Sequence, residues 1–182
     1  DVMSASLGPS WDDFVECING GSIFAIITAR GHNPMILKQA VYKLIKNNVS
    51  GLDQEKLVES LKKYRDFTGE DIKDDNTMIK EYLDMCRFHP VSFGTGSEAN
   101  PEEGKINALR EFITYCKELA NMVGGKVLFK NDVSNNFVVP SIGFSDDDER
   151  NVEKVKEFLN KEFGLEHPVT TYLTKSQTKT KY

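Results

Sequence analysis

Long apolar runs are missing from this sequence of 182 residues. No stretch approaches the roughly 18 apolar residues that a membrane-spanning helix needs, and the first residues show no signal-peptide pattern. Net positive charge is missing as well, because the formal net charge is −5. This argues against a nucleic-acid binder held by bulk charge, although it leaves room for a local basic patch. We expect no contact with a membrane.

Cysteine is scarce too. Cys17, Cys86 and Cys116 are odd in number, far apart in the sequence and surrounded by apolar residues with helical periodicity. This pattern predicts buried thiols rather than disulfides or a zinc site. Buried thiols fit a reducing compartment, so we expect a cytoplasmic protein.

The residues that are present describe an ordinary globular chain, with 39% apolar and 28% charged residues. The near-continuous apolar run at 22–28 predicts a parallel strand that is covered on both faces. Asn33 and Pro34 then form a strong helix start. Further elements are expected in this order: helices within 49–88, a short strand at 89–93, a helix at 100–123, a strand at 138–144, a helix closed by Gly164, and an edge strand at 168–173. The tail, 174–182, is expected to be mobile.

Alternating strands and helices indicate an α/β fold with a mostly parallel sheet. The segment 49–88 changes character, because it is charged and carries two amphipathic helical patterns. We expect it to be a helical, cap-like insertion into a core made of residues 1–48 and 89–182.

Three adjacent carboxylates, Asp146, Asp147 and Asp148, follow the strand at 138–144. Acids packed this closely repel by roughly 1–3 kcal/mol per pair, depending on the effective dielectric. At the carboxyl end of a buried strand, where α/β folds place their ligand sites, this repulsion indicates a bound cation. The alternative is a solvated first turn of a helix, where acids suit the helix dipole.

Thr28 ends another strand, and Lys105 lies in the first turn of the long helix. If the strands lie side by side, these two residues converge with Asp146 and Asp147. A hydroxyl and a lysine bind phosphoryl oxygens, while paired acids hold Mg²⁺. The grouping therefore predicts a phosphate site with a magnesium ion.

Three segments, IITARG at 26–31, EEGKINAL at 102–109 and SIGFSDDDERNVE at 141–153, resemble the second, third and fourth motifs of the haloacid dehalogenase superfamily. Their order and spacing match over roughly residues 22–160. The resemblance implies a Rossmann-like three-layer fold and a Mg²⁺-dependent phosphohydrolase.

Carried over by motif, the resemblance implies that Thr28 binds the transferring phosphoryl group. Ala29 and Arg30 beside it are expected to contact substrate, and a structural salt bridge is the alternative role of Arg30. It implies that Lys105 neutralises the phosphate. It also implies that Asp147 is a metal ligand with Asp146 as its neighbour, in a register uncertain by one residue, so that Asp148 is an alternative. Of the histidines, His32 is expected to be an exposed loop residue, and His89 and His167 are expected to be structural.

The family's first motif, a strand ending in the nucleophilic aspartate, is not found in these residues. Asp1 has no preceding strand, and Asp12 and Asp13 lie in a helix start. Without that aspartate no phospho-aspartyl intermediate can form. Either it lies upstream, or the protein is an inert relative.

The leading prediction is a Mg²⁺-dependent phosphomonoester hydrolase that acts on a phosphorylated small molecule or a nucleic-acid end. The alternative is a catalytically inert module of the same fold that binds a partner or supports an assembly. A flavodoxin-like receiver domain, which also gathers acids and a lysine at strand ends, fits the helical insertion less well.

Overall fold

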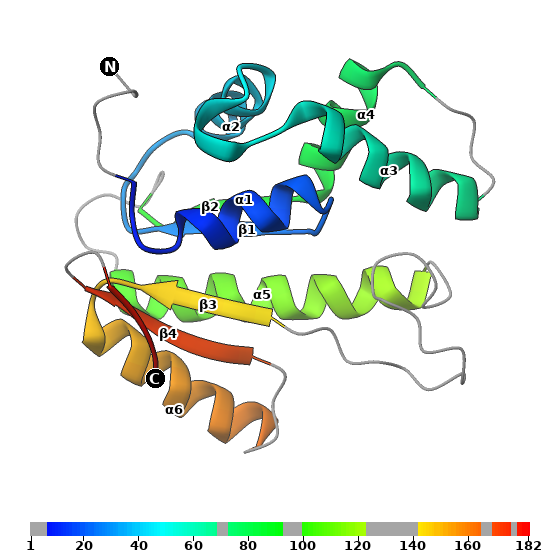
Figure 1. Cartoon of the computed structure of the whole chain (residues 1–182). Coiled ribbons are helices and arrows are strands. Elements are labelled where there is room, and N and C mark those ends of the chain that lie inside the picture. The colour runs from blue at the N-terminus through cyan, green and yellow to red at the C-terminus, as the bar shows by residue number, and fades with distance from the viewer. Residues whose placement is uncertain (1–6, 69–72, 93–99, 123–141, 165–168, 176–177) are drawn as a thin grey trace. The chain divides into compact units, whose positions relative to one another are not determined.

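The structure, a computed structural model, describes residues 7–68, 73–92, 100–122, 142–164, 169–175 and 178–182. The chain divides into two compact units. One comprises residues 1–14 and 139–182, and the other comprises residues 15–138. Figure 1 labels the helices and strands of both.

The unit of residues 15–138 contains a pair of parallel strands. β1 (Ala25–Thr28) and β2 (Arg87–Pro90) are in register, with Thr28 opposite Pro90. Helix α2 (Pro34–Lys46) packs against β2, and α5 (Pro101–Met122) packs against β1. The two helices lie on opposite sides of the strand pair (Figure 1). The expected strand–loop–helix unit is therefore confirmed.

A helical layer completes this unit. The 3₁₀ turn η2 (Val49–Gly51) leads to α3 (Gln54–Thr68) and α4 (Asp75–Met85), which pack against each other. Helix α4 also packs against α2. The buried apolar side chains of this layer include Leu57, Val58, Met78, Ile79, Tyr82 and Leu83. The two helices expected within 49–88 are confirmed, and their role as a cap-like insertion stays a prediction.

The other unit contains a mixed three-stranded sheet. β3 (Ile142–Asp146) pairs in parallel with β4 (Val169–Lys175), and β4 pairs antiparallel with β5 (Thr178–Lys181). Helix α6 (Glu149–Phe163) packs on β3 and β4 through the buried side chains Val152, Val155 and Leu159. Helix α1 (Trp11–Asn19) begins in this unit and ends in the other.

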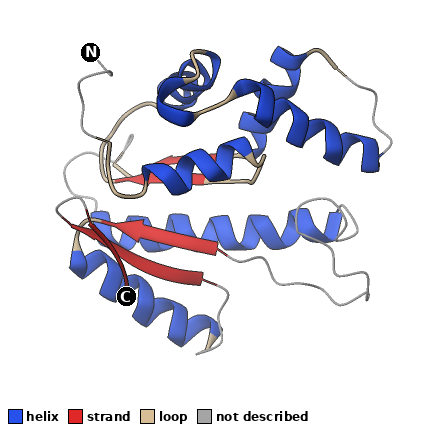
Figure 2. Cartoon of the chain, viewed as in Figure 1, coloured by secondary structure: helices blue, strands red, loops and turns tan. Residues whose placement is uncertain are grey.

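The described residues form a mixed α/β protein with six α-helices and two small sheets (Figure 2). One sheet is a parallel pair and the other is mixed. The expected α/β class is confirmed, whereas a three-layer Rossmann-like arrangement with a mostly parallel sheet stays a prediction. Of the strand expected at 138–144, residues 138–141 lie outside the described part, and β3 continues to Asp146.

The prediction of a mobile tail is wrong, because residues 178–181 form β5. The strand pairs with β4, and the side chain of Lys179 adds two contacts. Its Nζ atom lies 4.0 Å from the centroid of the Tyr172 ring and also pairs with Asp13. Alternating threonine and lysine therefore form an edge strand, and lysine is a common way to protect such an edge.

The three cysteines are free thiols, as expected. Cys86 and Cys116 are buried and Cys17 is partly buried. Burial raises the pKa of the Cys86 thiol to about 12 and that of Cys116 to about 11. Among the described helices, none is both long enough and apolar enough to cross a membrane. His167 lies outside the described residues.

Candidate functional site

Thr28 is the last residue of β1, and its hydroxyl is oriented by the loop that follows. The hydroxyl oxygen accepts a hydrogen bond from the backbone N–H of Arg30 at 3.3 Å. A hydroxyl that accepts one bond still has its own hydrogen to donate. Thr28 is partly buried, whereas Ala29, Arg30 and the nearby His32 are exposed. This strand end can therefore present a donor to a ligand, and the expected exposure of His32 is confirmed.

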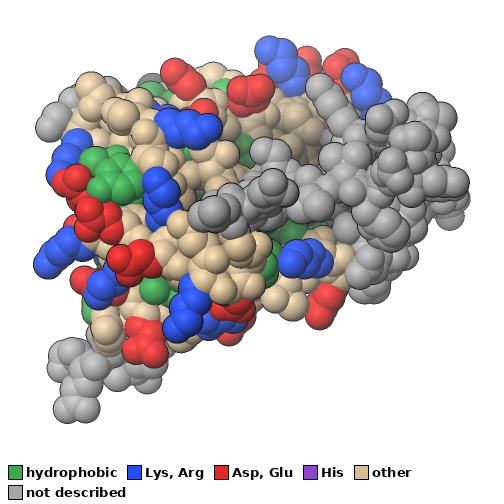
Figure 3. Space-filling view, turned by 90° about the horizontal axis from the view of Figure 1, so that it is seen from below, with side chains coloured by type: hydrophobic (Ala, Val, Ile, Leu, Met, Phe, Trp, Pro, Cys, Tyr) green, Lys and Arg blue, Asp and Glu red, His purple; other side chains and the backbone are tan. Residues whose placement is uncertain are grey.

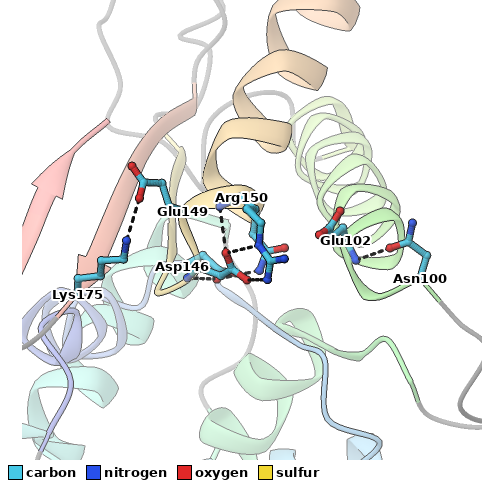
Figure 4. Close-up of polar contacts among 8 residues, drawn as sticks. Asn100, Glu102, Asp146, Glu149, Arg150 and Lys175 are labelled. Atoms are coloured by element: carbon cyan, nitrogen blue, oxygen red, sulfur yellow. Dashed lines mark hydrogen bonds and ion pairs between the residues drawn. The ribbon is translucent and has the colours of Figure 1, made fainter.

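Lys105 lies in the first turn of α5, and Asn100 stabilises the start of that helix. The side-chain oxygen of Asn100 accepts the backbone N–H of Glu102 at 3.1 Å (Figure 4). This N-cap, followed by Pro101, is the arrangement that the sequence predicts. Lys105 is partly buried. The helix fixes the backbone position of Lys105, and its flexible side chain carries a positive charge from there.

One residue links Thr28 to the turn that carries Lys105. The backbone N–H of Val91 donates to the carbonyl oxygen of Thr28 at 2.9 Å. Val91 also lies against Gly104, where a Cβ atom would come within 2.9 Å of the Val91 Cβ. Gly104 is the residue before Lys105. Of the predicted site residues, Thr28 and Lys105 are thus brought onto neighbouring backbone segments of one unit.

The acid cluster forms a hydrogen-bonded turn between β3 and α6 (Figure 4). One carboxylate oxygen of Asp146 accepts the backbone N–H of Asp148 at 2.9 Å and the side-chain amide of Asn151 at 3.1 Å. Asn151 is buried, with 8% of its surface exposed. Asp146 is therefore held in one orientation at the strand end.

Asp148 has a different role from its neighbours. It is the N-cap of α6, and it accepts the backbone N–H of Arg150 at 3.0 Å. It also forms an ion pair with the guanidinium of Arg150, with Nη2 2.9 Å from Oδ2. Asp147 is exposed and takes part in none of these bonds. Asp148 thus serves the helix start, and a cation at Asp146 and Asp147 stays a prediction.

The donor set at this turn is compatible with Mg²⁺. This ion takes oxygen ligands, keeps several waters and is commonly bound by one or two carboxylates together with substrate phosphate. Asp147 and Asp146 supply two adjacent carboxylates. Within the described ranges, no three His, Cys, Asp or Glu side chains come together as a metal-binding group. A cation here would therefore complete its shell with water, substrate or a residue from elsewhere.

The predicted site residues are divided between the two units. Thr28, Ala29, Arg30 and Lys105 belong to the unit of residues 15–138, and Asp146 and Asp147 belong to the other. Each half has its own local order. The convergence of the two halves on one phosphate stays a prediction.

A pocket that sequence reasoning missed lies between the segment of β2 and the face of α5 that carries Gly104 and Ala108. It has a volume of about 290 Å³, and its lining includes His89, Val91, Gly104, Asn107 and Glu111. The Nε2 atom of His89 is buried there without a hydrogen-bond partner among the described residues. Burial is the main reason why the pKa of His89 lies below its usual value. The sequence carries one signal for this close packing, a glycine inside a helix.

Charged side chains of both signs are interspersed over the described residues on the face shown in Figure 3. The fold and these strand ends define a mixed α/β protein with polar groups at the carboxyl ends of parallel strands. Comparisons with family models, curated proteins and solved structures found no match for this chain.

Proposed function

We propose that the protein is a Mg²⁺-dependent phosphomonoester hydrolase with a Rossmann-like core. The observation that carries the proposal is the link from Thr28 through Val91 to the turn of Lys105. A hydroxyl donor and a lysine on adjacent segments suit the binding of a phosphoryl group. The phospho-aspartyl mechanism also needs a nucleophilic aspartate, which is not recognised among these residues.

In this proposal the residues of the chain bind and stabilise the transferring group. The Thr28 hydroxyl donates its hydrogen to one phosphoryl oxygen, while the hydroxyl oxygen accepts the backbone N–H of Arg30. The ammonium group of Lys105 offsets the negative charge of the phosphoryl group and of the nucleophile. Asp147 and Asp146 would hold Mg²⁺, which when bound supplies Lewis-acid stabilisation of phosphoryl oxygens.

The substrate that this proposal favours is a small phosphate ester. Acidic and basic side chains alternate on the face in Figure 3, and the net charge is −5. Strong binding of a nucleic-acid backbone usually needs clustered positive charge. A phosphorylated nucleic-acid end remains the second substrate class.

The test is a phosphatase assay of the complete reading frame with p-nitrophenyl phosphate and Mg²⁺. Removing one preorganised donor typically lowers kcat by about 10²–10³-fold, so we expect a loss of this size for Thr28→Val. Thr28→Ser keeps the donor and is the matched control. Activity that survives EDTA, or that Thr28→Val and Lys105→Ala leave unchanged, would overturn the proposal.

A second candidate is a non-catalytic module of the same fold. The observation that favours it is the engagement of Asp146 and Asp148 in hydrogen bonds that organise the start of α6. This candidate predicts no turnover by the complete protein. It also predicts that substitutions in the acid cluster change stability alone.

A further inference from the structure

Gly104 lets the first turn of α5 approach the segment after β2 more closely than any other residue would. A Cβ atom at this position would lie 2.9 Å from Cβ and 3.3 Å from Cγ2 of Val91. Carbon atoms in ordinary contact are about 3.5–4.0 Å apart. Both of these atoms belong to the branched side chain of Val91 and lie close to its backbone, so they cannot move aside easily. A methyl group on residue 104 therefore forces α5 and the segment after β2 apart.

The same region shows a second close approach. A Cβ atom on Gly31, in the loop after Thr28, would lie 3.3 Å from the carbonyl oxygen of Ser92. The Val91 amide is bonded to the carbonyl oxygen of Thr28 at 2.9 Å. The loops after β1 and β2 and the start of α5 therefore meet at backbone contact distance, with Thr28 and Lys105 on two of these segments.

A glycine at this point is unfavourable for the helix itself, since glycine is among the poorest helix formers. Its neighbours in the pocket wall, Ala108 and Val91, are small or branched apolar residues. The close approach is the structural gain that offsets the poor propensity.

We propose that Gly104 is a positioning residue for the phosphate site, because its lack of a side chain sets the distance between Lys105 and Thr28. This inference rests on the proposed function. A methyl group at residue 104 has to push α5 away from Val91 by roughly half an ångström to restore ordinary contact. A shift of about 1 Å in a catalytic group can cost about 10²-fold in rate.

The test uses the complete reading frame and two measurements, kcat/KM for p-nitrophenyl phosphate and the affinity for inorganic phosphate by calorimetry. Gly104→Ala should lower kcat/KM by roughly 10- to 100-fold and weaken phosphate binding. Replacing Val91 with glycine removes its Cβ atom, which is the atom nearest to the added methyl group, so adding Val91→Gly should restore most of both. Gly8→Ala is the matched control, because a Cβ atom at Gly8 meets nothing within 4 Å.

A merely structural role gives a different result. Val58→Ala removes buried side-chain volume in α3 and should lower the melting temperature without lowering phosphate affinity. If Gly104→Ala leaves kcat/KM and phosphate affinity at wild-type values, or if adding Val91→Gly fails to rescue either, the positioning role is overturned. If the wild-type protein binds phosphate but shows no turnover, only the proposed hydrolase activity is overturned. The positioning role is then decided by whether the second substitution restores phosphate binding to Gly104→Ala. Wild-type protein that neither binds nor hydrolyses phosphate overturns both.

Discussion

His89 places an imidazole nitrogen inside the unit of residues 15–138 without a partner among the described residues. An unpaired buried nitrogen favours the neutral ring, because protonation would bury a charge. Burial is accordingly the largest cause of the lowered pKa, while Glu111 opposes the shift and Arg87 adds to it. The sequence predicts a structural histidine here, and a strand residue with a buried side-chain atom fits that role.

The lowered pKa of His89 predicts a pH dependence of stability. The unfolded chain takes up this proton near pH 6.5, whereas the folded protein does so only at lower pH. The stability that the neutral His89 side chain contributes is therefore fully present above about pH 6.5. It is lost as the pH falls through the pKa of His89 in the folded protein. We expect the free energy of unfolding to decrease from pH 7 to pH 5 in urea titrations, with a smaller decrease in His89→Gln. The matched control, His32→Gln at an exposed position, should keep the wild-type slope.

At the scale of elements, Asp148 caps helix α6, whereas Asp147 is the proposed metal ligand. Replacing a capping aspartate by alanine costs about 1 kcal/mol, and Asp148→Ala also removes the Arg150 ion pair, which is exposed and contributes little. We expect Asp148→Ala to lower the free energy of unfolding by about 1 kcal/mol in urea and to keep most Mg²⁺-dependent phosphatase activity. Asp147→Ala should leave the free energy of unfolding close to the wild-type value and remove most of the Mg²⁺-dependent phosphatase activity. Equal effects of the two substitutions on both measurements would contradict this division.

Local signals in the sequence predict the ends of helices well wherever a single residue determines the backbone conformation there. Asn33 accepts the Met35 amide at 2.8 Å, and Gly164 closes α6 with a φ of 79°. Both ends follow from the chemistry of the residues themselves. The strand β5 has no such signal, because it forms by pairing with β4, and its Lys179 side chain contacts Tyr172 in that strand and the distant Asp13. A pattern read along the chain cannot show these contacts.

The residues of the candidate site likewise fall into those that the sequence predicts and those that it does not. The residues proposed to bind phosphate and metal, Thr28, Lys105 and Asp147, could be picked out because each lies at or near a recognisable end of a strand or start of a helix. Val91 and Gly104 could not, because their role depends on a contact across the fold. Residue identity thus indicates what chemistry is available, and packing determines how those groups are spaced.

For the whole molecule, the proposed metal site predicts a link between Mg²⁺ and thermal stability. A ligand that binds only the folded state at ten times its Kd stabilises that state by about 1.4 kcal/mol. For a chain of this size, this raises the Tm by roughly 3–6 °C. We expect such a rise in scanning calorimetry of the complete protein with MgCl₂, and we expect EDTA to reverse it.

The acid substitutions show whether the rise comes from the proposed site. Asp147→Ala removes a carboxylate ligand and should abolish the Mg²⁺-dependent rise without lowering the Tm measured in EDTA. Asp148→Ala removes the α6 cap and should lower the Tm in EDTA while keeping the rise. A rise that persists in Asp147→Ala places the cation elsewhere on the chain, and the acids at the end of β3 then serve the start of α6 alone.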